Sequence, residues 1–205
     1  AYTVQCMVGN PPLSDRTPSE WTVRPGPPAE IITTLSDDEV VAGTPVDVDC
    51  VLRDAYGNTT SSDALEVRVD PPPARIERLG AQRFSIRTAG IYEVSCHVPG
   101  GPAVRGARLD VLPDLPASLA VELMPDAEIY GLGELLQVIA DVADILGNVV
   151  EDAAVTVSAQ PALRAFGPRR LLLDPAGEFR VTVRVDGPTH GNRPLVESRA
   201  IVVDG

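Results

Sequence analysis

The sequence has no lysine and few aromatic residues. All 17 basic side chains of the 205-residue chain are arginines, and Phe, Trp and Tyr together make up 4% of the residues. Without lysine the chain cannot form a Lys–Asn isopeptide cross-link. With so few aromatics, the core must be filled mainly by Val, Leu, Ile and Ala, which suits thin, strand-built layers.

Basic side chains are also outnumbered by acidic ones. The chain has 29 Asp and Glu residues against its 17 arginines, giving a formal net charge of −12 at pH 7. This charge disfavours binding to nucleic acid, whose phosphates need cationic partners, and to anionic membrane surfaces. Solubility explains the acidity most simply. The alternative is that acidic groups gather Ca²⁺ between domains.

Long apolar runs are missing as well. No segment is apolar enough to cross a bilayer, so we expect no direct membrane insertion. Residues 1–8 lack the basic region and the apolar run of a signal peptide. Together with the repeat described next, this leads us to expect that the sequence starts inside a longer protein.

The sequence does contain an internal repeat. Residues 43–58 align without a gap with residues 133–148, at a constant offset (133 − 43 = 90 and 148 − 58 = 90), and both end in Asp-x-x-Gly-Asn. The apolar residues of 131–147 also fit the spacing of an amphipathic helix. The aligned first copy, however, alternates apolar and polar residues with period two, so we expect a half-buried strand in both copies.

A second block recurs three times. Gly-Ile-Tyr-Glu-Val-Ser-Cys at 90–96 matches residues 177–183 and, at the start of the sequence, residues 1–6. Each copy is followed by a polar loop and a short apolar closing strand, at 21–23, 108–111 and 200–203. Proline-rich linkers at 24–28 and 112–116 follow the first two closing strands, and prolines stiffen such joints. The repeats predict three parts: the last strands of a truncated module at 1–27, and complete modules at 28–114 and 115–205.

The cysteines fit the same arrangement. Cys50 lies on the inward face of an early strand and Cys96 on the inward face of a late strand, where an immunoglobulin-type sandwich places its bridge. We therefore predict a Cys50–Cys96 disulfide. The second module has Ala140 and Val183 at the two equivalent positions. Cys6 aligns with Cys96, so we expect it to be unpaired because of truncation. Three free thiols in a cytosolic protein are the competing interpretation.

These blocks resemble the bacterial immunoglobulin-like (Ig-like) domains of surface proteins, including the invasin/intimin type. Filamin-like and other Ig-like rods share similar turns. The resemblance implies an all-β fold of tandem Ig-like β-sandwiches arranged end to end. In that family the Asp-x-x-Gly-Asn stretch is a turn between two core strands, where Gly and Asn tolerate positive φ. The residues that it assigns to structural turns here are Asp54, Gly57, Asn58, Asp144, Gly147 and Asn148.

Little in the sequence points to catalysis. His97 and His190 lie in different modules without a nucleophile motif beside them, and we expect both at the surface. The acidic run at 37–39 lacks the spacing of a calcium-binding loop, so we expect no metal site and no cofactor. Trp21 lacks the further aromatics of a sugar-stacking platform, and we expect it to pack against a domain boundary.

Three functions remain open. The first is a structural spacer or interaction module of a large extracellular surface protein, such as an adhesin, stalk or filament, with small contacts and no deep, polar-lined pocket between modules. The second is an Ig-like module that binds protein or carbohydrate through its long loops at 98–106 and 187–196. The third is an accessory region of a secreted enzyme. The expected partners are neighbouring Ig-like modules of the same chain, with other surface proteins, glycans or further copies as candidates.

Overall fold

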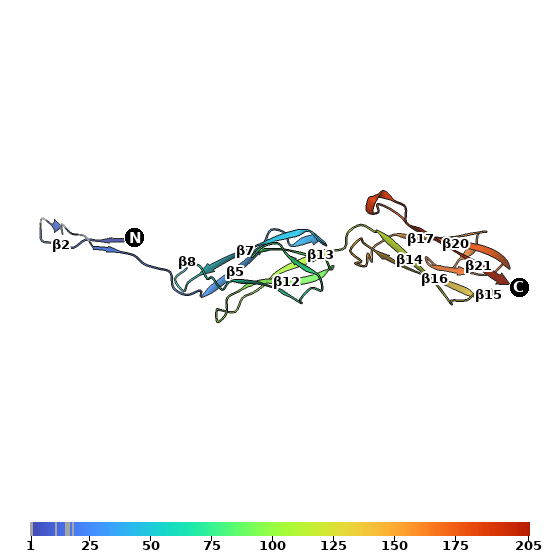
Figure 1. Ribbon diagram of the computed structural model, residues 1–205, viewed down its shortest axis with the longest axis horizontal. Helices are drawn as coiled ribbons and strands as arrows, with labels where there is room; N and C mark the ends of the chain where they lie inside the picture. The colour runs from blue at the N-terminus through green and yellow to red at the C-terminus, as the bar shows by residue number, and fades with distance from the viewer. Residues whose placement is uncertain (1, 11, 15–16, 18) are drawn as a thin grey trace.

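The computed structural model describes residues 2–10, 12–14, 17 and 19–205. Within them the chain forms β-strands joined by turns and loops, and the only helical element is the 3-10 turn η1 (His190–Asn192). No helix in this part of the chain is long and apolar enough to cross a bilayer. Figure 1 shows two sandwiches one after the other along the long axis, with a short pair of N-terminal strands before them.

The first sandwich contains strands β5 to β13 in two sheets. The order of the first sheet is β10 (Ile76–Arg78), β11 (Arg83–Ile86), β7 (Pro45–Arg53) and β5 (Glu30–Leu35), with the short β8 (Thr59–Thr60) also paired to β7. The order of the second sheet is β6 (Glu39–Val41), β13 (Ala107–Leu112), β12 (Gly90–His97) and β9 (Glu66–Asp70). All pairs are antiparallel except β6 with β13.

The second sandwich repeats this arrangement with strands β14 to β21. The order of its first sheet is β14 (Ser118–Met124), β16 (Leu135–Ala143), β19 (Arg170–Leu172) and β18 (Arg164–Ala165). The order of its second sheet is β15 (Ile129–Gly131), β21 (Val196–Asp204), β20 (Gly177–Val185) and β17 (Val155–Gln160). The single parallel pair, β15 with β21, again corresponds to β6 with β13.

This strand order is that of an Ig-like sandwich. In an Ig fold, strands A, B, E and D form one sheet and strands C, F and G form the other. In the first sandwich β5, β7, β11 and β10 take the places of A, B, E and D, and β9, β12 and β13 take those of C, F and G. The predicted all-β, Ig-like fold is confirmed. The exact module boundaries at residues 28, 114 and 115 stay a prediction.

Each sandwich has its own core, because side chains alternate between the two faces of each strand. Buried residues of the first sandwich form one cluster and those of the second form another. Strand β16 illustrates how the alternation works. Leu136, Val138, Ala140 and Val142 are buried there, at every second position. This is the period of a strand and not that of an amphipathic helix. The strand prediction for this segment is confirmed.

The N-terminal strands form the hairpin-like pair that the repeat predicts. Strand β1 (Tyr2–Val4) pairs antiparallel with β4 (Ser19–Trp21), and the short β2 (Met7–Val8) pairs with β3 (Leu13–Ser14). Their assignment to a further module stays a prediction. The expectation for Trp21 was wrong: its side chain is 64% exposed. Among the described residues, no second sheet covers this strand pair.

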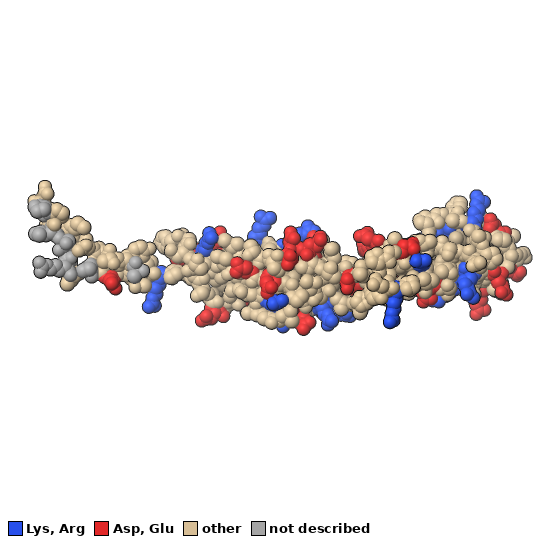
Figure 2. All heavy atoms as spheres, turned by 90° about the horizontal axis from the view of Figure 1, so that it is seen from above, with Lys and Arg blue, Asp and Glu red and all other residues tan. Residues whose placement is uncertain are grey.

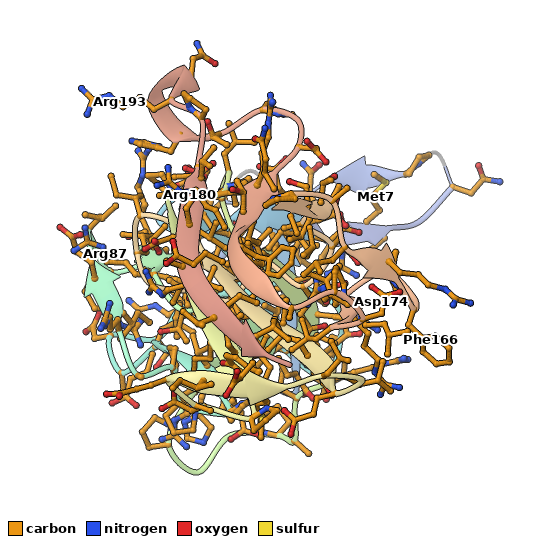
Figure 3. The ribbon with its side chains drawn as sticks, turned by 90° about the vertical axis from the view of Figure 1, so that its right-hand side faces the viewer. Met7, Arg87, Phe166, Asp174, Arg180 and Arg193 are labelled. Carbon is orange, nitrogen blue, oxygen red and sulfur yellow. A yellow bond between two sulfur atoms is a disulfide. The ribbon has the colours of Figure 1, made fainter. Side chains whose placement is uncertain are left out.

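The surface carries charges of both signs. On the face drawn in Figure 2, acidic and basic side chains are scattered over both sandwiches, and neither sign gathers into one large patch. Seen along the long axis in Figure 3, Arg87 and Arg193 point outward. The five ion pairs in the described part of the chain involve partly exposed side chains, and pairs of this kind contribute little to stability.

Candidate functional site at the joint between the sandwiches

After strand β7 the chain turns back at Asp54, and this carboxylate organises the turn. Its Oδ1 accepts hydrogen bonds from the backbone N–H groups of Tyr56 and Asn58, both at 2.9 Å. Its Oδ2 accepts one from the Asn58 side-chain amide at 3.0 Å and one from the backbone N–H of Gly26, also at 3.0 Å. Gly57 has a φ of +81°, which glycine adopts without strain. Because Gly26 belongs to the incoming linker, the turn ties that linker to the sandwich.

The turn after strand β16 repeats this network at the same positions. Oδ1 of Asp144 accepts from the backbone N–H groups of Leu146 and Asn148, both at 2.8 Å. Oδ2 accepts from the Asn148 side-chain amide at 2.8 Å and from the backbone N–H of Asp114 at 3.0 Å. Gly147 has a φ of +85°. Asp114 lies in the linker between the sandwiches, so the second copy also holds its own incoming linker.

Both carboxylates are held in their charged form. Hydrogen bonds from the side chain of Asn58 and from the backbone of Gly26 lower the pKa of Asp54 to about 2. Burial raises the pKa of Asp144, but the hydrogen bonds from Asn148 and Asp114 outweigh it, so that this pKa also lies below its ordinary value. Hydrogen bonds to an ionised acceptor are stronger than neutral ones, which favours a well-defined turn.

The second turn also contacts the preceding sandwich, through the amide of Asn148. Its Oδ1 accepts a hydrogen bond from the backbone N–H of Ala89 at 2.8 Å. Its Nδ2 donates to the backbone carbonyl of Arg87 at 3.1 Å, in addition to its bond with Asp144. Arg87 and Ala89 lie at the corner between strands β11 and β12 of the first sandwich. One side chain therefore joins the two sandwiches by two hydrogen bonds.

Two neighbouring contacts complete the joint. The side chain of Leu146 packs against the core of the first sandwich, with its Cδ1 3.5 Å from where a Cβ on Gly43 would lie. The backbone carbonyl of Leu146 accepts a hydrogen bond from the Arg75 guanidinium at 2.9 Å. The turn thus combines apolar packing with hydrogen bonds, and Asn148 is buried where it crosses the joint.

A groove of about 570 Å³ lies beside these contacts. Residues 88–90, Val111 and Pro113 line it from the first sandwich and the linker, and residues 147–152 line it from the second sandwich. Its charged side chains, Glu151 and Asp152, are both acidic. The groove is open and its lining is mainly apolar, with the two acidic side chains at one side, so it does not contradict the expectation of no deep, polar-lined pocket at this place.

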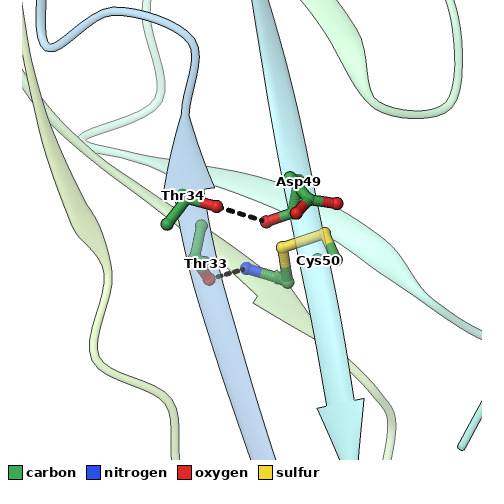
Figure 4. The surroundings of a disulfide bond; sticks show 5 residues. Thr33, Thr34, Asp49 and Cys50 are labelled. Atoms are coloured by element: carbon green, nitrogen blue, oxygen red, sulfur yellow. Dashed lines mark hydrogen bonds between the residues drawn. A yellow bond between two sulfur atoms is a disulfide. The ribbon is translucent and has the colours of Figure 1, made fainter. Parts of the chain in front are cut away.

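The predicted disulfide is present in the first sandwich. Cys50 on β7 and Cys96 on β12 are bonded to each other (Figure 4), and their Cα–Cα distance of 5.9 Å lies within the range that a disulfide requires. Thr33 lies beside the bridge, and its hydroxyl accepts a hydrogen bond from the backbone N–H of Cys96 at 3.0 Å. The bridge joins the two sheets at their centre, as in other Ig-like sandwiches.

The remaining cysteine and the equivalent positions differ. Cys6 is exposed and free, and its pairing with a cysteine outside the sequence stays a prediction. In the second sandwich Ala140 and Val183 occupy the places of the bridged pair and are both buried. The second sandwich therefore closes the same inter-sheet space with apolar side chains.

The two histidines lie in different sandwiches and form no common site. His190 belongs to the 3-10 turn η1 of the second sandwich and is exposed. His97 differs from the expectation of a surface side chain, because it is half-buried and its Nδ1 is buried without a hydrogen-bond partner. The described residues contain no group of three or more His, Cys, Asp or Glu side chains arranged to hold a metal ion.

The sequence predicted the two turns but not their contacts with the linkers and with the neighbouring sandwich. It assigned Asp54, Asn58, Asp144 and Asn148 to turns within a sandwich, where the structure places them. It did not foresee the bonds from the two Asp side chains to the linkers, or those from Asn148 to the first sandwich. The available signal was the repeat itself. The same Asp-x-x-Gly-Asn motif occurs once in each repeat after a proline-rich linker, which suggests a contact between the turn and the linker.

Comparisons with known proteins give a fold-level likeness. No family model matches the chain, and no curated protein matches it. Among solved structures, the Escherichia coli adhesin FdeC aligns with 87% of the chain at 20% identity and a TM-score of 0.43. The Yersinia pseudotuberculosis adhesin InvE aligns with 85% at 12% identity and a TM-score of 0.41. The full Ig1–Ig3 ectodomain of mouse nectin-like molecule 4 aligns with 86% at 13% identity and a TM-score of 0.45.

The aligned part covers 65%, 59% and 64% of those three chains, which is less than two thirds of each. At these identities and scores the likeness does not distinguish a bacterial adhesin from an animal cell-surface protein. The fold assignment therefore rests on the strand order and on the position of the disulfide.

Proposed function

We propose that the chain is a stretch of stiff, tandem Ig-like modules that act as a spacer and interaction region in a larger extracellular surface protein, such as an adhesin, stalk or filament, and not as an enzyme. The observation that carries this proposal is the bridge from Asn148 to the backbone of Arg87 and Ala89. It joins neighbouring modules through backbone groups, at a turn that also fixes the linker.

The joint supports stiffness for a geometric reason. A single hydrogen bond leaves two bodies free to rotate about it, whereas two bonds from one planar amide to groups two residues apart restrict that rotation. Leu146 adds an apolar contact at the same place, and Pro113 fixes one φ of the linker. A spacer needs such restriction, because a flexible linker makes the distance between two ends variable.

Two further features support an extracellular position. The Cys50–Cys96 disulfide is typical of proteins that fold in an oxidising environment. The scattered charges and the net charge of −12 favour solubility and disfavour nucleic acid as a partner. The two histidines, the side chains best suited to proton transfer near neutral pH, lie in different sandwiches, which supports a non-catalytic role.

We also propose that β1 and β4 are the last two strands of a third sandwich. Tyr2 pairs with Trp21 in the ladder, as Tyr92 pairs with Leu109 in the first sandwich. In the second sandwich Phe179 pairs with Ile201 in the same way. Val4, Cys6 and Val23 extend the match, corresponding to Val94, Cys96 and Val111. All five N-terminal side chains are exposed, whereas their counterparts in the first sandwich are core residues. An apolar face of this kind needs a covering sheet.

Small-angle X-ray scattering on the chain tests the spacer proposal. A compact chain of 205 residues would have a radius of gyration of about 17 Å. We expect a clearly larger value and a pair-distance distribution with the long tail of a rod. A value near that of a compact particle contradicts the proposal. The predicted contact between modules, well below about 1,000 Å², stays a prediction.

A second candidate function is ligand binding in the groove at the joint. The groove is favoured by its position, since ligand sites occur preferentially between domains, and by its mixed lining with Glu151 and Asp152. The acidic side chains favour a cationic or hydrogen-bond-donating ligand. If this is the main function, substituting both acids by Gln and Asn abolishes binding of the natural partner without changing the scattering profile.

A further inference from the structure

The two Asp-x-x-Gly-Asn turns have the same internal network but different surroundings. In the second turn, Asn148 is buried against the first sandwich and Leu146 is half-buried. In the first turn, Asn58 is exposed, and Tyr56, at the position of Leu146, is 90% exposed. Among the described residues, the side-chain amide of Asn58 bonds only to Asp54. The first turn thus has the same hydrogen-bond network as the second, but none of the described residues forms a sandwich that packs against it.

The linker before the first turn has the length that such a contact needs. At the occupied joint, the core residue Val111 lies three positions before Asp114, whose N–H binds the turn (114 − 111 = 3). Before the first turn, Val23 occupies the place of Val111, and Gly26 donates the equivalent N–H (26 − 23 = 3). In both places, therefore, the same number of residues separates the last strand from the linker residue whose N–H binds the turn.

From these observations we infer that the Asp54–Asn58 turn is a docking surface for an Ig-like sandwich, the one to which β1 and β4 belong. Asn58 binds the backbone of that sandwich's corner just before β1, accepting from one N–H and donating to the carbonyl two residues earlier. Tyr56 packs beside it in the role that Leu146 has at the occupied joint. This inference rests on the proposed assignment of β1 and β4 to a third sandwich.

A repeated joint of this kind has a consequence for the shape of the protein. If the same turn, linker length and corner recur, each sandwich is related to the next by the same rotation and translation. Successive modules then form a regular rod with a constant step, because one repeated relation between neighbours generates a helical arrangement. The Asn of each turn is therefore the positioning residue that sets the step.

The C-terminal end of the second sandwich provides the matching half for a test. Its corner between β19 and β20 places Asp174 and Ala176 where the first sandwich has Arg87 and Ala89 (174 − 87 = 87 and 176 − 89 = 87). Asp174 lies at the end of the molecule that faces the viewer in Figure 3. Gly133, the counterpart of Gly43, has no described atom within 4 Å of the place of a Cβ, so that the position where Leu146 approaches Gly43 at the occupied joint is open here.

The test joins a complete sandwich to the first turn. Residues 115–203 are fused directly to residues 24–205, so that Val203 replaces Val23 and the three-residue spacing is kept. Side-chain amide signals of ¹⁵N-asparagine are then followed in this fusion and in the unmodified chain, with Asn58 assigned by Asn58→Ala. We expect hydrogen exchange of the Asn58 amide to slow by at least about tenfold in the fusion, approaching that of Asn148.

Two variants of the fusion complete the design. Asn58→Ala should release the added sandwich, so that its residual dipolar couplings no longer fit the alignment of the first sandwich, while the Asn148 joint stays intact. Asn148→Ala should release only the original joint. A second fusion, residues 28–111 joined to 24–205, replaces the first if the added sandwich fails to fold. Fast exchange at Asn58 in a folded fusion overturns the inference, whereas the spacer proposal fails only if the unmodified chain is compact in solution.

Discussion

The two sandwiches share one strand order but are stabilised by different side-chain links. The first has the Cys50–Cys96 disulfide between its sheets, where the second has buried Ala140 and Val183. The first fixes the start of β12 by a hydrogen bond from the Tyr92 hydroxyl to the carbonyl of Thr88 at 2.9 Å. The second has Phe179 at the position of Tyr92 and no hydroxyl there.

The second sandwich has instead a tyrosine at another corner. The Tyr130 hydroxyl donates to the carbonyl of Pro125 at 3.0 Å, and Tyr130 corresponds to Val40 in the first sandwich (130 − 40 = 90). Period-two burial and the Asp-x-x-Gly-Asn turn are common to both copies, whereas the disulfide and the tyrosines are not. The shared features therefore specify the fold. The disulfide and the tyrosine hydrogen bonds add stability, and they lie at different positions in the two sandwiches.

The disulfide should account for the largest difference in stability. Replacing Cys50→Ala together with Cys96→Val gives the first sandwich the residues of the second. Because the bridge closes a loop with a sequence separation of 46, we expect the free energy of unfolding of the first sandwich to fall by about 4 kcal/mol. Urea titration monitored by NMR signals of each sandwich measures this, and the transition of the second sandwich should not move.

The two turn carboxylates offer the next comparison. Asp144→Ala removes the acceptor of three backbone N–H groups and one amide, and we expect the second sandwich to lose about 3 kcal/mol of unfolding free energy. Exchange of the Ala89 N–H should also accelerate, because Asn148 loses its support. The matched Asp54→Ala variant should weaken the first turn and leave Ala89 protected. Equal effects of both variants at Ala89 would mean that the joint does not depend on its own turn.

The tyrosines allow a smaller, reciprocal test. Tyr92→Phe removes the bond to Thr88 and should lower the unfolding free energy of the first sandwich by about 1 kcal/mol. Tyr130→Phe should do the same to the second sandwich alone. Separate thermal or urea transitions for the two sandwiches give both values. A loss that appears in the wrong sandwich would show that the two cores are coupled across the joint.

Acidification should loosen the first turn over a defined range. The pKa of Asp54 is about 2 in the folded chain against an ordinary 3.8, so that folding favours the charged carboxylate. Its stabilising contribution is therefore complete above about pH 4 and is lost as the pH falls toward 2. The backbone N–H of Tyr56, monitored by NMR, should follow this titration. In Asp54→Asn the same signal should keep a constant position over this range.

The sequence predicted the strands and the disulfide because both constrain which residue types occur at given positions. Alternation in β7 and β16 and the paired loss of two cysteines can be read directly from the aligned copies. The contacts of the joint could not be predicted in this way. Asn148 binds the backbone of Arg87 and Ala89, and backbone groups are the same whatever the residue. The expectation for Trp21 failed because it assumed a neighbouring domain that the described residues do not contain. The expectation for His97 failed because alternation along β12 says nothing of what covers the outward face of the strand.

Asn148 is the side chain that we propose holds the two sandwiches in one orientation. Residual dipolar couplings of backbone N–H groups, measured for the unmodified chain in a dilute aligning medium, test it most directly. We expect both sandwiches to fit a single alignment tensor, and Asn148→Ala to give each its own tensor while their cores stay folded. Two different tensors in the unmodified chain would contradict the claim.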